Sequence, residues 1–151
     1  MALSEGNPAP PISLKDESGN PFSLSSLLGK SVVLYFYPKA GTGGCTLESK
    51  EFRDKSGNFA AKDAVIVGIS PDNEADQLKF KTELGLPFKL LADPDHAVAE
   101  AYGVWKEKIR DGKTSMGVDR TTFLIGPDGA IRQIFGAVNP DGHAEEVLAV
   151  V

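Results

Sequence analysis

The stretch SVVLYFYPKAGTGGCTLESKEFRD, residues 31–54, leads from an unbroken apolar run into a glycine-rich loop and the only cysteine of the chain, Cys45. The run from Ser31 to Pro38 is β-branched and aromatic, which is typical of a buried central strand, and a proline ends it. A helix is predicted beyond the loop, from about Cys45 to Ala60. Its inward residues are predicted to include Leu47, Phe52 and Phe59. The stretch therefore predicts a strand, a loop and a helix, with a thiol where the helix begins.

The rest of the chain alternates predicted strands with predicted helices. Short strands and hairpins are predicted at residues 12–24, 64–70, 87–93 and 119–138. Helices are predicted at residues 70–85, 93–103 and 141–151, the first two opened by Ser-Pro and Asp-Pro pairs. This order predicts an α/β fold with a central mixed β-sheet flanked by helices and an N-terminal β-hairpin.

Composition limits the class of protein. The 151 residues are 41% hydrophobic and 25% charged, which predicts one globular domain over residues 1–151. The net charge of −5 argues against nucleic acid and anionic membranes as partners. Residues 1–14 carry Glu5 and three prolines where a secretory signal needs a basic start and an apolar centre. With one cysteine, no internal disulfide can form, and a cytoplasmic location is expected.

Three features of its setting point to chemistry at Cys45. It follows the carboxyl end of a central strand, where open α/β sheets usually bind ligands. It lies in the predicted first turn of a helix, where free N–H groups favour an anion. Gly41, Gly43 and Gly44 allow backbone amides to approach closely. Together these features favour a nucleophilic thiolate, although a lone cysteine is often only a small buried apolar residue.

The spacing of Pro38, Thr42 and Cys45 closely resembles the active-site segment of the peroxiredoxins, in particular the bacterioferritin-comigratory-protein or Q-type group. A second segment, YGVWKEKIRDGKTSMGVDRTTFLIGPDG at residues 102–129, matches the same group. The likeness runs in order from about residue 7 to the C-terminal helix. Two separated motifs over most of the chain make the resemblance specific.

The resemblance implies a thioredoxin-like fold and a thiol-dependent peroxidase that reduces hydrogen peroxide and organic hydroperoxides. By position, Cys45 is the peroxidatic cysteine and is oxidised to a sulfenic acid. Thr42 contacts the thiolate and the peroxide oxygen, Arg120 holds the thiolate and the developing oxyanion, and Pro38 screens the pocket from water. No cofactor or metal is expected. Each supporting residue has a plainer alternative: a solvated edge-strand arginine, a turn threonine and a strand-ending proline.

The chain departs from the pattern of this group at three positions. Gly43 stands where a proline is usual, so the loop is expected to be more mobile. Lys50 and Lys81 stand at the two positions where relatives carry a resolving cysteine. The chain therefore resembles a one-cysteine peroxiredoxin, whose sulfenic acid needs an external thiol: thioredoxin, glutaredoxin or a low-molecular-weight thiol. Because Q-type relatives are often monomers, a monomer is expected.

Other assignments stay open from the sequence. A thioredoxin-like redox-sensing or binding module, oxidised once at Cys45 and read by a partner, is the alternative to an enzyme. Glu48 either complements the helix dipole or has a structural role in the site. His96 and His143 are predicted at the solvated surface, and Trp105 is predicted to serve packing.

Overall fold

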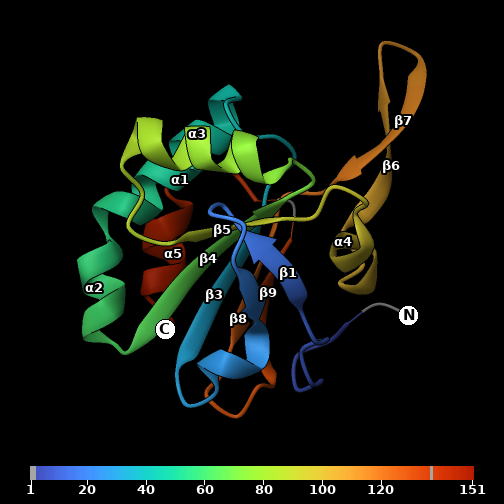
Figure 1. Cartoon of the computed structure of the whole chain (residues 1–151). Coiled ribbons are helices and arrows are strands. Elements are labelled where there is room, and N and C mark those ends of the chain that lie inside the picture. Colours follow the sequence, from blue (N-terminus) through green and yellow to red (C-terminus); the bar gives the residue numbers. More distant parts are fainter. Residues whose placement is uncertain (1–2, 137) are drawn as a thin grey trace.

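The sheet at the centre of the molecule is built around β3 (Ser31–Phe36), the apolar run that precedes the glycine-rich loop. All six of its residues are buried. The structure is a computed structural model that describes residues 3–136 and 138–151. Figure 1 shows the sheet running through the middle of the molecule, with helices on its two faces. A strand that is apolar along its whole length requires this double cover.

Seven strands form the central sheet in the order β2-β1-β5-β4-β3-β8-β9. The strands β3, β4 and β5 run parallel, and the other neighbouring pairs are antiparallel, so the sheet is mixed as predicted. The remaining bounds are β1 (Ser13–Asp16), β2 (Pro21–Ser23), β4 (Ala64–Ser70), β5 (Lys89–Ala92), β8 (Thr121–Ile125) and β9 (Ile131–Phe135), with the short helix η1 (Leu24–Leu27) after β2.

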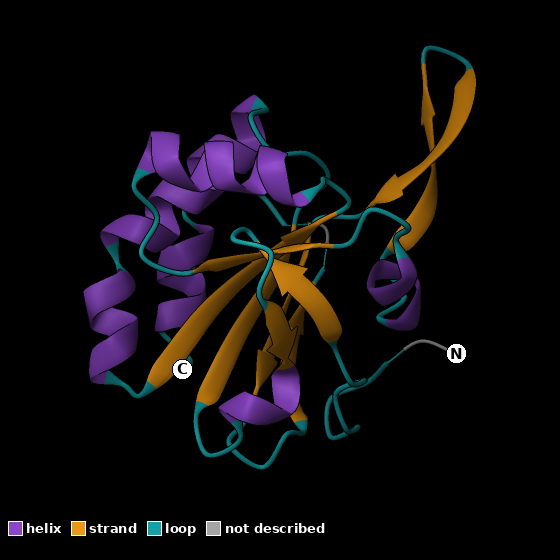
Figure 2. Cartoon of the chain, viewed as in Figure 1, coloured by secondary structure: helices purple, strands orange, loops and turns teal. Residues whose placement is uncertain are grey.

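The helices divide unequally between the two faces (Figure 2). One buried cluster joins the sheet to four of them, and the other joins the opposite face to a single α-helix, with the short helix η1 also packed against it. The four helices are α1 (Gly43–Asp54), α2 (Ser56–Ala61), α3 (Glu74–Leu84) and α5 (His143–Leu148), and the single one is α4 (Ala97–Ala101). Among the described residues, none of the helices is long and apolar enough to cross a membrane.

Several helix predictions need correction. The helix predicted for residues 45–60 is two helices, α1 and α2, which meet at Lys55. Leu47, predicted to face inward, is 39% exposed. The third helix begins later than predicted, because Asn73 provides its N-cap and accepts a hydrogen bond from the N–H of Asp76. Its predicted end at Gly85 is confirmed by the left-handed conformation of that residue.

A hairpin that the sequence analysis did not predict projects from the body (Figure 1). Its strands, β6 (Trp105–Arg110) and β7 (Lys113–Val118), pair with each other and form a separate two-stranded sheet. Four of the six residues of β6 are charged, three of them in a row, and Ile109 is 72% exposed. This pattern differs from the continuous apolar runs that marked the strands of the main sheet.

His143 is not at the surface, contrary to the prediction. It is 2% exposed, its ring lies edge-on to Phe52 and Phe135, and its Nε2 hydrogen-bonds the hydroxyl of Thr122 at 2.7 Å. Burial lowers its pKa, although Glu146 at the other ring nitrogen opposes the effect. His143 therefore helps to join α5 to the sheet in its uncharged form.

Candidate active site

The loop from Tyr37 to Thr42 leads from the end of β3 to the start of α1. Tyr37 is fully buried and Pro38 half-buried, so the chain leaves the sheet at a fixed point. Gly41 takes a φ of +84°, a conformation that favours glycine. The backbone N–H of Ala40 then donates to Asp72 at 2.8 Å, which ties the loop to the segment between β4 and α3.

Cys45 lies in the first turn of α1, as predicted, and its exposed fraction is 0%. The turn begins at Gly43, after Thr42 as N-cap residue. The free N–H groups of a first helical turn and the helix dipole favour negative charge there. The position of the sulfur thus combines burial, which opposes charge, with a helix terminus that stabilises an anion.

Arg120 reaches this helix from the neighbouring strand, although it is 75 residues away in the sequence. In the pairing of β3 with β8, Thr121 lies opposite Phe36 at the carboxyl end of β3. Arg120 directly precedes Thr121 and therefore enters the sheet beside the loop that carries the cysteine. The antiparallel register of two strands accounts for the meeting of two distant motifs.

The guanidinium of Arg120 bridges two side chains of α1. Its Nη2 donates to Sγ of Cys45 at 3.4 Å, and its Nη1 donates to Oε1 of Glu48 at 2.8 Å. Cys45 and Glu48 are three residues apart, so they share one face of the helix. The Arg120 side chain is 16% exposed and that of Glu48 is 0% exposed. The hydrogen bond to the buried Glu48 thus holds the planar guanidinium in place, with a second N–H group directed at the sulfur of Cys45.

Glu48 and Arg120 influence each other's pKa through this contact. Burial raises the pKa of Glu48 to about 7, although the charge and hydrogen bond of Arg120 oppose the rise. Burial by itself would lower the pKa of Arg120. The neighbouring Cys45 and Glu48 outweigh this effect, so the pKa of Arg120 is raised overall. Arg120 therefore stays a cation, while Glu48 can change its charge near neutral pH.

A pH-dependent stability is expected from Glu48. Its folded pKa of about 7 exceeds the ordinary value of 4.5, so the folded state binds the proton more tightly than the unfolded state. Stabilisation by this group is complete below about pH 4.5 and is lost as the pH rises to about 7, at up to about 1.4 kcal/mol per pH unit. Between pH 5 and pH 7.5 the native sequence should therefore lose stability that Glu48→Gln does not lose. The free energy of unfolding of Glu48→Gln minus that of the native sequence, measured by urea titration, should rise with pH. A difference that stays constant or falls with rising pH would contradict this account.

Gly44 provides the space in which Arg120 approaches the helix. A Cβ atom at this position would lie 3.0 Å from Nη2 of Arg120 and 3.6 Å from Pro140. A Cβ atom at Gly43 would meet nothing within 4 Å. Of the two adjacent glycines, only Gly44 is therefore tightly packed against the site.

Under the prediction that Cys45 reacts with peroxide, Gly44→Ala is expected to lower the second-order rate constant for peroxide about tenfold, because a Cβ atom 3.0 Å from Nη2 displaces the guanidinium from its present position. Gly43→Ala is the matched control and should stay within about twofold of the native sequence. Stopped-flow measurement of Cys45 oxidation in the two variants tests the difference. Equal rates in both variants would show that the contact between Arg120 and Cys45 does not limit the reaction.

The two other predicted site residues lie in the same loop but make different contacts. Thr42 is exposed, and its hydroxyl donates to the carbonyl of Lys39 at 2.8 Å. Pro38 is half-buried and lines a hollow of about 290 Å³ together with Trp105 and Met116 of the projecting hairpin. Their predicted roles toward thiolate and peroxide stay predictions.

Tyr35 and Ser49, two buried residues without a predicted role, help to hold the helix that carries the cysteine against the sheet. Tyr35 of β3 hydrogen-bonds the hydroxyl of Ser49 at 2.9 Å, and its ring stacks on Phe52. Both partners belong to α1, on the face that meets the sheet. The buried position of Tyr35 within the apolar run gave a signal for packing, but the partner of its hydroxyl could not be inferred before the fold was known.

Comparison with known proteins identifies the class. The AhpC/TSA family matches residues 6–134, and the chain belongs to that family. It is 45% identical over 148 residues to Peroxiredoxin Bcp of Bacillus subtilis, covering 98% of this chain and 94% of that protein.

Solved structures of the same group agree. A cysteine-to-serine mutant of Xylella fastidiosa PrxQ superimposes with a TM-score of 0.93 at 32% identity, covering 99% of this chain and 95% of that one. The bacterioferritin comigratory protein of Xanthomonas campestris, described for its alkyl peroxide reduction activity, gives 0.87 at 36% identity, covering 91% and 88%. The predictions of a Bcp or Q-type peroxiredoxin, of a thioredoxin-like fold and of a thiol-dependent peroxidase are confirmed.

Proposed function

We propose that Cys45 is the residue that reduces the peroxide and that Arg120 stabilises the charge that moves during the reaction. The observation that carries the proposal is the forked contact of the Arg120 guanidinium, with one nitrogen on Sγ of Cys45 and the other on Glu48. A cation fixed in this way is aimed at the sulfur before a substrate arrives. Such donors act without reorganising when the reaction occurs.

In the first half-reaction the thiolate of Cys45 attacks one peroxide oxygen and the O–O bond breaks. The sulfur is oxidised to a sulfenic acid, and the other oxygen leaves with a proton as an alcohol or as water. Negative charge passes from sulfur to the leaving oxygen, so a donor beside the sulfur stabilises both ends of the path. Thr42 and Pro38, in the loop before α1, are assigned to substrate contact and to shielding from water.

In the second half-reaction an external thiol removes the sulfenic oxygen as water and forms a mixed disulfide with Cys45. A second thiol then releases the Cys45 thiol and leaves as a disulfide. An external donor is needed because the chain has no second cysteine, with lysines at positions 50 and 81. Thioredoxin, glutaredoxin and low-molecular-weight thiols are the candidate donors.

The substrate range, assembly and location form part of the same proposal. The Xanthomonas relative is described for alkyl peroxide reduction, which supports organic hydroperoxides as substrates beside hydrogen peroxide. A monomer in the cytoplasm suits a chain that depends on reduced thiols from its surroundings. Light scattering coupled to size-exclusion chromatography tests the monomer.

Without an added thiol, peroxide consumption is expected to stop after one equivalent per chain, because the sulfenic acid cannot be resolved internally. Stopped-flow or electrode measurement of peroxide, followed by intact-mass analysis, tests this stoichiometry. Addition of thioredoxin with its reductase, glutaredoxin with glutathione, or glutathione alone should then restart turnover and rank the donors. Continued consumption without any thiol would contradict the scheme.

A further inference from the structure

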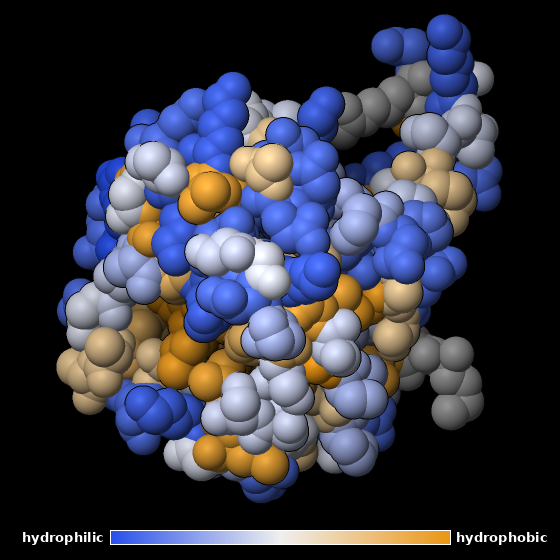
Figure 3. Space-filling model, viewed as in Figure 1, coloured by the Kyte–Doolittle hydropathy of each residue, from blue (hydrophilic) through white to orange (hydrophobic). Residues whose placement is uncertain are grey.

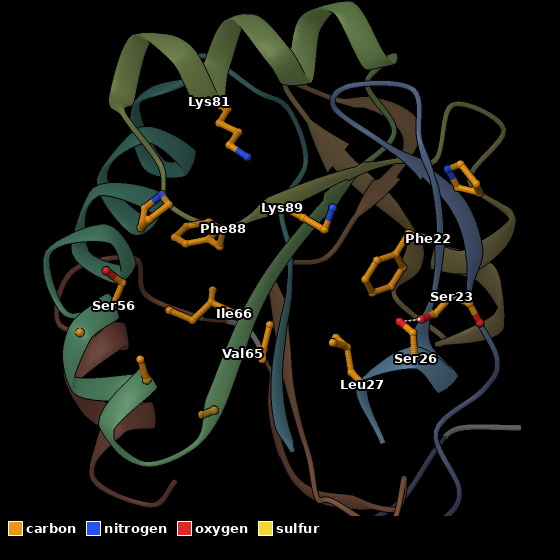
Figure 4. Close-up of a pocket in the computed structure, with 15 residues that line it drawn as sticks. Phe22, Ser23, Ser26, Leu27, Ser56, Val65, Ile66, Lys81, Phe88 and Lys89 are labelled. Carbon is orange, nitrogen blue, oxygen red and sulfur yellow. Dashed lines mark hydrogen bonds between the residues drawn. The ribbon is translucent and has the colours of Figure 1, made fainter. Parts of the chain in front are cut away.

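A second hollow, of about 840 Å³, lies between α2 on one side and β2 with η1 on the other, beside the first residues of β4. Figure 4 shows its walls: Ser56 of α2 on one side, Ser23, Ser26 and Leu27 on the other, and Lys81 reaching in from α3. Its volume is within the range of pockets that bind small molecules, roughly 300–1,000 Å³. The hollow shares none of its lining residues with the predicted site at Cys45.

The hollow exists because two parallel strands do not match in length. The pairing of β4 with β3 begins at Ala64, but the pairing of β4 with β5 begins only at Val67, opposite Lys89. Pro87 lies just before β5 and has no N–H with which to extend the pairing. Residues 64–66 of β4 therefore have a strand neighbour on one side and face the hollow on the other.

The lower part of the hollow is apolar. Phe88 and Ile66 lie on one side, with Phe22 and Leu27 facing them from β2 and η1 (Figure 4). Figure 3 shows the same region as a gathering of hydrophobic residues below the hydrophilic surface of α3. Contact with these side chains would remove the apolar surface of an aliphatic ligand from water, which favours binding.

The hollow also carries two cations. Lys81 and Lys89 both line the hollow, and none of the described lining residues is acidic. Lys81 pairs with Glu17 at 2.7 Å and Lys89 with Asp16 at 2.9 Å. Both carboxylates are only 2% exposed, whereas the lysine side chains are 30% and 54% exposed.

These ion pairs hold the lysines in place without using all of their donors. Each ammonium has three N–H groups, and one bond to a carboxylate leaves others for a ligand. The hydrogen bond to Asp16 also raises the pKa of Lys89, so its head group stays charged. The hollow thus offers positive charge at its upper end, from Lys81, and between its aromatic walls, from Lys89, next to apolar surface.

We propose that this hollow binds a small amphipathic anion, an aliphatic carboxylate whose chain lies against Phe22, Ile66 and Phe88 and whose head group meets Lys81 and Lys89. The shape of the hollow and the sign of its lining charge favour this class over a neutral or a cationic amphiphile. From Cys45 to Asp54, α1 runs nine residues, about 14 Å, before the first lining residue of α2. The ligand therefore occupies a site apart from the reacting sulfur.

Ligand chemistry provides the first test, because replacing either lysine would leave a buried carboxylate unpaired. Decanoate and decyltrimethylammonium, each below its micelle concentration, and decanol, below its solubility limit, are titrated into the full chain by calorimetry. Decanoate is expected to bind about tenfold more tightly than decanol, which lacks one charge-assisted interaction. Decyltrimethylammonium is expected to bind more weakly than either. A cation that binds as well as decanoate, or no binding of decanoate at all, would overturn the proposal.

Two adjacent alanines of α2 provide the second test. Ala60 and Ala61 are both exposed, but only Ala60 lines the hollow. Ala60→Trp should fill the space and weaken decanoate binding at least tenfold, whereas Ala61→Trp should change it less than twofold. Amide chemical shifts in the native sequence should move at residues 64–66 and 88–89. Equal binding by the two tryptophan variants would refute the location.

The proposal does not depend on the peroxidase assignment. Cys45→Ser should bind decanoate as the native sequence does, because the sulfur lies outside the hollow. A loss of decanoate binding in that variant would contradict the separation of the two sites. Peroxide turnover in Ala60→Trp is measured in parallel, so that failure of one assignment is distinguished from failure of the other.

Discussion

Peroxide consumption by Cys45→Ser is expected to fall to the rate of protein-free buffer, a loss of roughly 10³-fold or more. A serine hydroxyl is hardly ionised at neutral pH and forms no stable oxidised state with peroxide. The variant should still fold, because an oxygen at this buried position can accept the hydrogen bond that Arg120 Nη2 gives to Sγ. Stopped-flow assay with a saturating thiol donor measures the loss, with circular dichroism as the folding control.

The same experiment separates the enzyme from its alternative. A redox-sensing or binding module would be oxidised slowly, and its native sequence would consume peroxide no faster than Cys45→Ser does. Fast consumption that depends on Cys45 identifies a peroxidase. Equal, slow rates would favour the module, with a partner protein as the reader of the oxidised state.

Arg120→Gln is expected to lower the second-order rate constant for peroxide about 10²–10³-fold, the usual effect of removing one fixed donor from a developing anion. The change also removes the hydrogen-bonding partner of the buried Glu48, which should destabilise the fold by about 1–3 kcal/mol. Urea unfolding and single-turnover oxidation of Cys45 measure the two effects separately.

The double variant Arg120→Gln with Glu48→Gln distinguishes chemistry from packing. Removing the buried carboxylate should restore much of the lost stability, because no uncompensated charge remains. The rate should stay low, since the guanidinium is still missing beside Sγ. If the rate recovered together with the stability, Arg120 would act through the fold alone.

Much of the fold could be predicted because its central strands are buried on both faces. The runs at residues 31–38 and 64–70 are apolar apart from one terminal serine each, and both contribute to the parallel core of the sheet. The β6–β7 hairpin was missed because its strands are mostly polar and exposed, with neither an apolar run nor a regular alternation of apolar and polar residues. The break at Lys55 was missed because the apolar spacing of Phe52 and Phe59 continues across the junction of α1 and α2.

The site could be predicted only in part. The glycine-rich turn and the spacing around Cys45 gave its position, but the contact of Arg120 depends on the register between β3 and β8. The burial of Glu48 and of His143 is likewise set by tertiary packing, which local sequence does not reveal. The hollow beside residues 64–66 of β4 could not be predicted from the sequence, because it arises where β4 extends beyond its pairing with β5.

The complete burial of Cys45 has a consequence for the order of events in the catalytic cycle. Two sulfur atoms must come within about 2.05 Å to join, and a thiol carried on another protein cannot do so inside a closed helical turn. Contact with a protein thiol therefore requires that the residues covering Sγ, Arg120 among them, move aside.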